Sequence, residues 1–330
     1  QELLDIISKK NIKFSPVEAL GKITRSYNHT QHHIDDILKL DLVDIEAIKQ
    51  QKYTIAVDAI NSVGGIAVPM LLEKLGVTVI GLYCEPNGKF EHPPEPLPQN
   101  LSELAALVTK TNADLGIAID PDVDRLVLVD NKGNMFGEEY TLVAVADYVL
   151  SETPGNTVSN LSSSRALKDI AEKHKVEYHG SAVGEKNVVE KMKEVNAVIG
   201  GEGSGGIIYP ELHYGRDALV GIALFLSHLA KSNSAAEELR SRYTNYFMSK
   251  QKISLPEMES VANILPSFAI SYNEYEVSTI DGVRVDFEES WVHVRASNTE
   301  PILRIYSEAP TQDEADELAE RIIREINELL

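Results

Sequence analysis

The residues best suited to chemistry are three aspartates that alternate with other residues along one short turn. Asp120, Asp122 and Asp124 lie between two apolar runs, and Arg125 follows them directly. Carboxylates this close repel one another, so an ordered loop of this kind favours a bound cation, and oxygen-only ligands suit Mg²⁺ or Ca²⁺ rather than zinc. The adjacent arginine could hold a phosphate against such a metal. The spacing alone is equally compatible with a solvated acidic turn.

A glycine-rich stretch has the composition of a ligand-binding loop. Five of the seven residues from Gly200 to Gly206 are glycines, and they surround Glu202 and Ser204. Glycine costs folding entropy, so such a run is typical of a place where the backbone must approach something closely. Glu202 and Ser204 would there present hydrogen-bonding groups to a polyol. The alternative interpretation is a flexible turn.

A tight polar loop near the C-terminus has the composition of a phosphate site. It combines one arginine, two hydroxyls and an amide with several backbone N–H groups, a set that can surround a phosphate dianion. The residues are Arg295, Ser297, Asn298 and Thr299. Polar loops of this kind are also common by chance. Together, a metal loop, a hydroxyl-binding loop and a phosphate cradle imply a phosphorylated sugar held between domains.

The elements that must position these loops change in character along the chain. From Tyr53 onward, continuous apolar runs alternate with helical stretches, which is the pattern of α/β units with buried parallel strands. The run 115–119 would deliver the aspartates to a carboxyl end of the sheet, where open α/β sheets bind ligands. After Leu255 and Pro256 the runs alternate apolar and polar residues, which predicts an antiparallel sheet with one solvated face.

The predicted fold class is therefore α/β, with two tandem mixed α/β domains followed by an α+β C-terminal domain that has an antiparallel sheet. We expect residues 1–50 to be a linker or the remnant of another domain. The expected domains are 51–152 with the metal loop, 153–252 with the sugar loop and 253–330 with the phosphate loop.

Composition and charge exclude several classes of function. The formal charge of −20 argues against nucleic acid as a partner. No signal peptide and no apolar run of membrane-spanning length occur, so no membrane is expected as a partner. The single cysteine, Cys84, fits a reducing compartment, and the cytoplasm is the expected location. His32 and His33 are adjacent and would diverge by about 100° on a helix, which predicts surface positions rather than a chelate.

The three loops resemble those of the α-D-phosphohexomutases, a family that interconverts hexose 1- and 6-phosphates. Its metal loop is similar to D-x-D-G-D-R, its sugar loop to G-E-x-S-G-[HG] and its phosphate loop to R-x-S-[GN]-T-E-P. The chain matches them at 120–125, 201–206 and 295–301, and the resemblance covers the sequence from about residue 50 to the end. It implies an isomerase acting as a phosphoglucomutase, phosphomannomutase or phosphoglucosamine mutase, and it does not select the hexose or an oligomeric state.

The resemblance also implies roles for individual residues. Metal ligands for Mg²⁺ would be Asp120, Asp122 and Asp124, supported by Arg125. Sugar hydroxyls would be held by Glu202 and Ser204, with Lys186 as a further candidate for contacting the ligand. The substrate's non-reacting phosphate would be bound by Arg295, Ser297, Asn298 and Thr299.

Three features depart from the family pattern. Val123 stands where the metal loop often has glycine, which changes backbone freedom but not the ligands. Gly206 stands where many members have histidine, whose role could be taken by His213. No T-A-S-H-N-P-like sequence for the family's catalytic serine occurs, and Ser162 to Ser164, the nearest cluster, lack that motif. The resemblance thus implies a fragment without most of the N-terminal domain, inactive by itself, of an enzyme that works through a phosphoserine and a sugar bisphosphate.

Two other interpretations of the aspartate loop come from different classes of protein. Haloacid-dehalogenase-like phosphatases also place D-x-D after a strand near Mg²⁺, but a third aspartate at position 124 favours a metal cage over a nucleophile. A calcium-binding EF-hand would need glycine where Arg125 stands and glutamate where Asn131 stands. A non-catalytic sugar-phosphate-binding protein remains an alternative.

Overall fold

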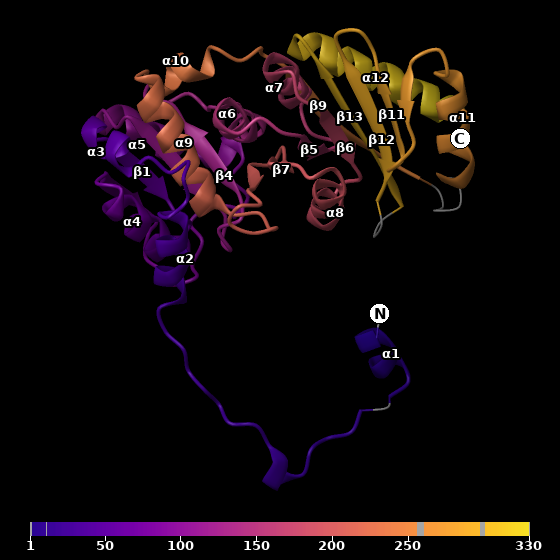
Figure 1. Ribbon diagram of the computed structural model, residues 1–330. Helices are drawn as coiled ribbons and strands as arrows, with labels where there is room; N and C mark the ends of the chain where they lie inside the picture. The colour runs from indigo at the N-terminus through magenta and orange to yellow at the C-terminus, as the bar shows by residue number, and fades with distance from the viewer. Residues whose placement is uncertain (1, 11, 256–260, 298–300, 330) are drawn as a thin grey trace.

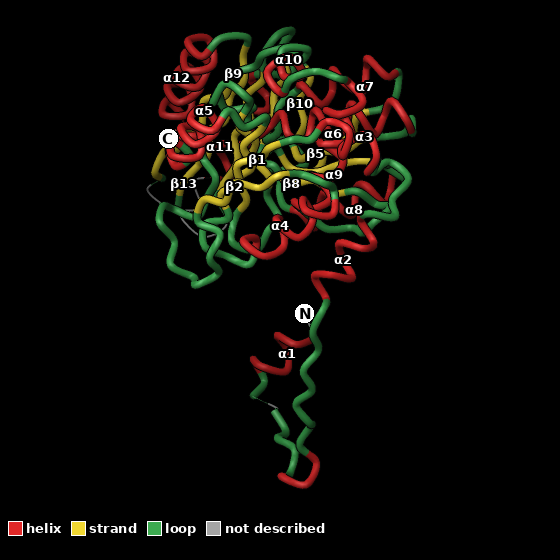
Figure 2. The backbone as a smooth tube through the Cα atoms, turned by 90° about the vertical axis from the view of Figure 1, so that its left-hand side faces the viewer, coloured by secondary structure: helices red, strands yellow, loops and turns green. Residues whose placement is uncertain are grey.

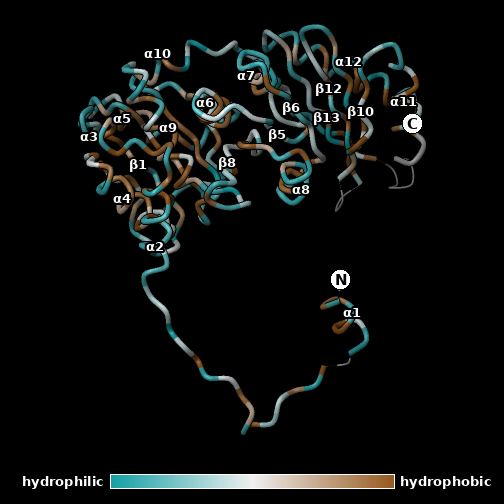
Figure 3. The backbone as a smooth tube through the Cα atoms, viewed as in Figure 1, coloured by the Kyte–Doolittle hydropathy of each residue, from teal (hydrophilic) through white to brown (hydrophobic). Residues whose placement is uncertain are grey.

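The N-terminal segment extends away from the body of the protein. The computed structural model describes all residues except 1, 11, 256–260, 298–300 and 330. Figure 1 shows the segment with α1 (Glu2–Ser8) and the short 3-10 helix η1 (Val17–Ala19) leading into α2, far from the three domains. Parts of this segment are coloured brown for hydrophobic residues in Figure 3. Its apolar side chains include Leu3 and Phe14, which are exposed.

The first domain is built on a four-stranded sheet in the order β2-β1-β3-β4. The first three strands are parallel, whereas β4 runs antiparallel to β3. Helices lie on both faces, as Figure 2 shows for α4 and α5 around β1 and β2. The strands are β1 (Thr54–Asp58), β2 (Thr78–Leu82), β3 (Leu115–Ile119) and β4 (Leu126–Val129); the helices are α2 (His29–Ile37), α3 (Ile45–Gln51), α4 (Gly64–Lys74), η2 (Pro98–Asn100) and α5 (Ser102–Thr111). Every residue of β3 is buried, as its continuous apolar run predicts.

The second domain repeats the topology of the first. Its sheet has the order β6-β5-β7-β8, again with three parallel strands and an antiparallel edge strand. The elements are β5 (Thr157–Asn160), α7 (Ala166–His174), β6 (Tyr178–Ser181), α8 (Glu185–Val195), β7 (Ile199–Glu202) and β8 (Gly206–Ile208). The aspartates follow β3 and the glycine-rich loop follows β7, so both predicted loops occupy the same position in the repeated fold.

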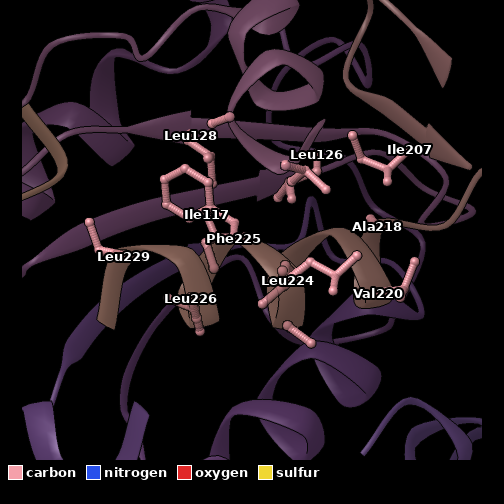
Figure 4. Packing of buried hydrophobic residues seen from close by; sticks show 14 of the residues in the cluster. Ile117, Leu126, Leu128, Ile207, Ala218, Val220, Leu224, Phe225, Leu226 and Leu229 are labelled. Carbon is pink, nitrogen blue, oxygen red and sulfur yellow. The ribbon is translucent and has the colours of Figure 1, made fainter. Parts of the chain in front are cut away.

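Two long helices join these domains by packing across them. Helix α6 (Glu138–Glu152) follows β4 but packs on α7 and β7 of the second domain. Helix α9 (Ala218–Ser232) follows β8 but packs on β4, α2 and α3 of the first domain, and α10 (Ala236–Arg240) comes next. Figure 4 shows Leu224 and Phe225 of α9 beside Leu126 and Leu128 of β4. One apolar core therefore runs through both domains.

The C-terminal domain has a separate core under an antiparallel sheet. Its five strands have the order β10-β11-β12-β13-β9, and α12 packs against β9 and β13. The elements are β9 (Phe247–Ser254), α11 (Val261–Ser271), β10 (Glu276–Ser278), β11 (Val283–Asp286), β12 (Trp291–Ala296), β13 (Ile302–Ala309) and α12 (Gln312–Leu329). Alternate strand residues such as Val292 and Val294 face this core. The predicted fold class is confirmed.

In the described part of the chain, none of the helices combines the length and the apolar content that crossing a membrane requires.

Candidate functional site

The aspartate loop is shaped by hydrogen bonds to its first carboxylate. Oδ1 of Asp120 accepts bonds from the backbone N–H groups of Asp124 and Arg125, both at 3.0 Å. One carboxylate oxygen from each of Asp120, Asp122 and Asp124 lies within 4.8 Å of the other two. Val123, in the position where the family pattern has glycine, takes the left-handed conformation with φ of 64°. The sequence therefore places a valine where glycine would be unstrained.

The electrostatics of this loop favour a divalent cation. Burial of Asp120, together with the nearby carboxylates of Asp124 and Asp122, raises the pKa of its carboxyl to about 7. Arg125 offers only loose compensation, since its Nε lies 3.5 Å from Asp120 Oδ2 and 3.9 Å from Asp124 Oδ1. A cation among the three oxygens would relieve the repulsion, and an all-oxygen set fits Mg²⁺.

The glycine-rich loop fixes one buried carboxylate in the turn between β7 and β8. Glu202 is 7% exposed, and its Oε1 accepts bonds from Asn160 Nδ2 at 2.9 Å and from the N–H of Gly184 at 3.1 Å. Gly205 has a φ of +87°, and a Cβ there would lie 2.4 Å from the carbonyl oxygen of Leu126, so only glycine fits. Ser204 is half-buried in the same turn.

Arg216 connects the two loops, and the sequence interpretation missed it. Its Nη2 donates to Asp124 Oδ2 of the metal loop, and its Nη1 donates to Glu202 Oε2 of the sugar loop at 2.8 Å. Its backbone N–H donates to Glu185 Oε1 at 2.9 Å. Burial opposes the guanidinium charge, but Asp124, Glu202 and Glu185 outweigh that effect and raise the pKa of Arg216. The only sequence signal was a cation just before a helix.

The backbone also joins the metal loop to the sugar loop and to α9. The N–H of Leu126 donates to the carbonyl of Gly205 at 2.9 Å, and the N–H of Ala218 donates to the carbonyl of Val123 at 3.0 Å. The structure therefore brings the predicted metal and sugar residues together into one site, although the two loops are about eighty residues apart in the chain.

Asp281 links the phosphate loop to this site. Oδ2 of Asp281 lies 3.2 Å from Arg295 Nε and accepts a bond from the N–H of Val183 at 3.0 Å, next to Gly184, which binds Glu202. Ser297 is 5% exposed, and its N–H donates to the carbonyl of Ile302. Two of the predicted phosphate ligands, Asn298 and Thr299, lie outside the described residues.

Two further cations stand beside Arg295 on the same face of the sheet. Arg295 on β12 is directly opposite Arg304 on β13, and Arg304 is opposite Lys252 on β9. Side chains of directly paired residues share a face, and like charges so placed repel each other. We call Arg295, Arg304 and Lys252 the basic row. It concentrates positive charge in a way that the strand patterns alone do not reveal, because its members are aligned only by the register.

Of three other residues singled out in the sequence, two lie apart from this network and the third supports it. The amine of Lys186 is exposed and 3.7 Å from Glu190, so its side chain does not reach Glu202 in this structure. His213 pairs with Asp217 at 3.1 Å instead of entering the sugar loop. Ser163, from the serine cluster, accepts a bond from the N–H of Gly203 and so supports the sugar loop.

Family models match consecutive parts of the chain. The phosphoglucomutase/phosphomannomutase alpha/beta/alpha domain II model matches residues 31–133, the domain III model residues 137–246 and the C-terminal domain model residues 238–325. Together they cover most of the sequence, in the order of the three sheets.

Individual proteins show the same likeness. A phosphoglucomutase/phosphomannomutase of Thermococcus kodakarensis is 35% identical over 290 residues, which cover 87% of this chain and 64% of that protein. The crystal structure of a phosphoglucomutase/phosphomannomutase family protein from Burkholderia thailandensis superposes with a TM-score of 0.84 at 24% identity, over 99% of this chain and 69% of that one. An Aspergillus fumigatus N-acetylphosphoglucosamine mutase, solved in complex with GlcNAc-6P and magnesium, gives a TM-score of 0.63 at 16% identity, over 89% and 69%.

Proposed function

Because this chain belongs to the phosphoglucomutase/phosphomannomutase family, we propose that it binds a hexose phosphate with Mg²⁺ as part of a cytoplasmic enzyme that interconverts hexose 1- and 6-phosphates. The observation that carries the proposal is Arg216, which ties Asp124 of the metal loop to Glu202 of the sugar loop. A metal and a sugar hydroxyl bound there would share one rigid site.

Asp120, Asp122 and Asp124 are the proposed ligands of Mg²⁺. Bound there, the ion would neutralise charge on a phosphoryl group that faces the loop. Arg125, beside Asp120 and Asp124, is placed to orient such a group with its guanidinium. The magnesium complex of the Aspergillus fumigatus mutase agrees with this choice of ion.

Glu202 and Ser204 are the proposed contacts for sugar hydroxyls, and Lys186 is a further candidate if its exposed side chain turns inward. Oε2 of Glu202 already accepts a bond from Arg216, so the carboxylate is held in place and aimed before a ligand arrives. The names of the similar proteins include glucose, mannose and N-acetylglucosamine phosphates. We therefore assign the substrate as a hexose or hexosamine phosphate.

The basic row is the proposed grip on the non-reacting phosphate. Arg295 and Arg304 place like charges directly opposite each other, and Asp281 offsets one of the three charges of the row, so a phosphate dianion beside the guanidinium groups would find a favourable place. Ser297, Asn298 and Thr299 would complete the site from the adjoining loop. The substrate would then reach from this grip to the metal loop, past Glu202.

The reacting phosphoryl group is proposed to come from a serine that these 330 residues do not supply. The chain spans 64% of the length of its Thermococcus kodakarensis relative, and it contains no T-A-S-H-N-P-like motif. We accordingly expect it to bind sugar phosphates but not to convert glucose 1-phosphate, even with glucose 1,6-bisphosphate added. Turnover at the rate of a complete mutase would contradict this part of the proposal.

Calorimetry with glucose 6-phosphate in the presence of Mg²⁺ tests the binding proposal. Replacing Arg295 or Arg304 by alanine removes a charge-assisted hydrogen bond to phosphate, so the dissociation constant should rise about tenfold or more. Arg324→Ala is the matched control, because that arginine lies on α12 with its side chain 67% exposed. Equal affinity of Arg295→Ala and Arg324→Ala would refute the assignment of the phosphate grip.

A further inference from the structure

A second cluster of potential metal ligands lies away from the aspartate loop, where α2 meets the turn before α9. His33 Nε2 is 2.6 Å from Asp217 Oδ2, and His213 Nε2 is 3.1 Å from the same oxygen. The two imidazole rings have centroids 5.7 Å apart. His33 and Asp217 are 184 positions apart in the chain, so only the fold brings these side chains together.

The carboxylate of this cluster is fixed by the start of α9. Oδ1 of Asp217 accepts bonds from the N–H groups of Leu219 and Val220 at 2.8 and 3.2 Å, which is the geometry of a helix N-cap. These bonds leave Oδ2 directed toward both histidines. The cluster thus contains one pre-oriented oxygen ligand.

The two histidines remain accessible from solvent, with side chains 35% and 43% exposed. Each directs its Nε2 at the same oxygen, and all three ligand atoms lie within 4.8 Å of one another. Two imidazole nitrogens with one carboxylate oxygen form a set that suits zinc and similar divalent ions, unlike the all-oxygen aspartate loop. An ion would replace the protons that the two Nε2 atoms share with Oδ2, the neutral rings then carrying their proton on Nδ1. A modest separation of the three atoms would open room for it.

We propose that His33, His213 and Asp217 bind a zinc-class divalent cation through Nε2, Nε2 and Oδ2, with the remaining coordination positions filled by water or a further side chain. His29 is placed to supply that side chain, since it lies four residues before His33 and hence on the same face of α2. The hydrogen bonds to Oδ1 of Asp217 are the outer contacts that hold such a ligand in place.

The bound cation would clamp α2 onto the turn that carries Arg216. Arg216 directly precedes Asp217 and donates to Asp124 and Glu202. Fixing Asp217 would restrict that turn and so steady the contact between the metal loop and the sugar loop. The proposed zinc site does not rest on the proposed mutase function, so either proposal can fail without the other.

Zinc uptake is measured by competition against a chromophoric chelator, in the Asp122→Asn background and excess Mg²⁺ so that the aspartate loop does not contribute. The unaltered cluster should take one zinc ion. His33→Ala and His213→Ala should each weaken binding at least about 100-fold, because losing only an outer contact already weakens metal sites by about 10- to 100-fold. His32→Ala, the exposed neighbour, is the matched control and should leave the affinity unchanged.

Two further measurements keep the test independent of folding defects. Circular dichroism should show unaltered folding for the histidine variants, and His213→Gln should repeat the loss seen with alanine. The visible spectrum of Co²⁺, taken up in place of zinc, should disappear in both histidine variants. Absence of zinc uptake by the unaltered cluster would overturn the proposal, as would its loss in only one of the two histidine variants.

Discussion

The metal and sugar loops rest on one shared apolar core, whereas the phosphate loop belongs to a domain with a core of its own. The shared core includes residues from Ile34 to Tyr243, and α6 and α9 each pack on the neighbouring domain. A backbone hydrogen bond from Leu126 to Gly205 joins the two loops directly. Moving one loop relative to the other would therefore require opening a close-packed interior.

The contacts of the C-terminal domain with the rest of the protein are largely polar. Arg284 Nη1 donates to the carbonyl of Leu161 at 2.6 Å, the N–H of Arg165 donates to Glu308 at 2.9 Å, and Asp281 accepts from Val183. Polar interfaces between domains commonly permit relative motion. The aspartate and glycine-rich loops are therefore fixed to each other, whereas the loop that carries the proposed phosphate grip is held to them largely by polar contacts. Such a division would suit the proposed substrates, whose free phosphate can occupy either end of the sugar.

The largest expected effects come from removing one large side chain from each core. Phe225→Ala in the shared core and Ile305→Ala in the C-terminal core should each destabilise their own core by about 3 kcal/mol or more, because both side chains are fully buried. Hydrogen exchange followed by mass spectrometry should show Phe225→Ala loosening both α/β domains together. Ile305→Ala should loosen only β9 to α12.

The opposite pattern would break the comparison. If Ile305→Ala accelerates hydrogen exchange in α9 as much as in β12, the protein unfolds as a single unit. The C-terminal domain then does not move independently of the two α/β domains. If Phe225→Ala loosens the first domain but spares α6 and β7, the shared core does not couple the two α/β domains.

The next effect in size concerns Arg216. Arg216→Ala leaves the carboxylates of Asp124, Glu202 and Glu185 close together without their cation, which should reduce the free energy of unfolding by about 3 kcal/mol. Urea unfolding measures this change, and Arg216→Lys should recover only part of it because lysine lacks the forked donors. Arg242→Ala is the control, since that arginine is exposed. Equal stability of the Arg216→Ala and Arg242→Ala variants would show that the two loops are held by the core alone.

A smaller effect is expected from the contact between the phosphate loop and the second domain. Asp281→Asn removes the ion pair with Arg295 and weakens the acceptor for Val183, for a loss of about 1 kcal/mol. The rate of amide hydrogen exchange should increase at the end of β12 and at residues 183–184, and it should stay unchanged in α9. Glu317→Gln, at an exposed position of α12, serves as the control. A rise in α9 equal to that in β12 would contradict an adjustable grip.

Sequence patterns predicted the parts of the protein that depend on local chemistry. The apolar runs around Asp120 and the alternating residues of β12 predicted the strands and the fold class, because side-chain periodicity is a local property. The positions of the aspartate, glycine-rich and phosphate loops within the fold followed from these strands. Whether each predicted residue binds the ligand assigned to it stays a prediction.

What the sequence did not predict depends on contacts between distant residues. Arg216 is 92 positions from Asp124, so nothing nearby in the sequence indicates their pairing. The basic row requires the register of three strands, which a one-residue shift would abolish. His33 was expected to lie on the surface and to form no metal site with His32. In the structure it pairs with Asp217 and lies beside His213.

The smallest expected effect is at Val123, where the junction between the two loops holds a valine in the left-handed conformation. Val123→Gly should relieve about 1–2 kcal/mol of backbone strain. It should also lose about 1 kcal/mol of partial side-chain burial and about 0.5–1 kcal/mol to glycine's greater freedom in the unfolded chain. The net change in unfolding free energy should therefore stay within about 1 kcal/mol of zero.

Val198→Gly is the control, because this half-buried valine has a negative φ and no strain to relieve. The substitution should lower the free energy of unfolding by about 2 kcal/mol. Urea unfolding measures both variants. If Val123→Gly and Val198→Gly lose the same free energy of unfolding, the hydrogen bond between Val123 and Ala218 does not force a strained backbone on the loop. The loop would then adapt to the core instead of being set by it.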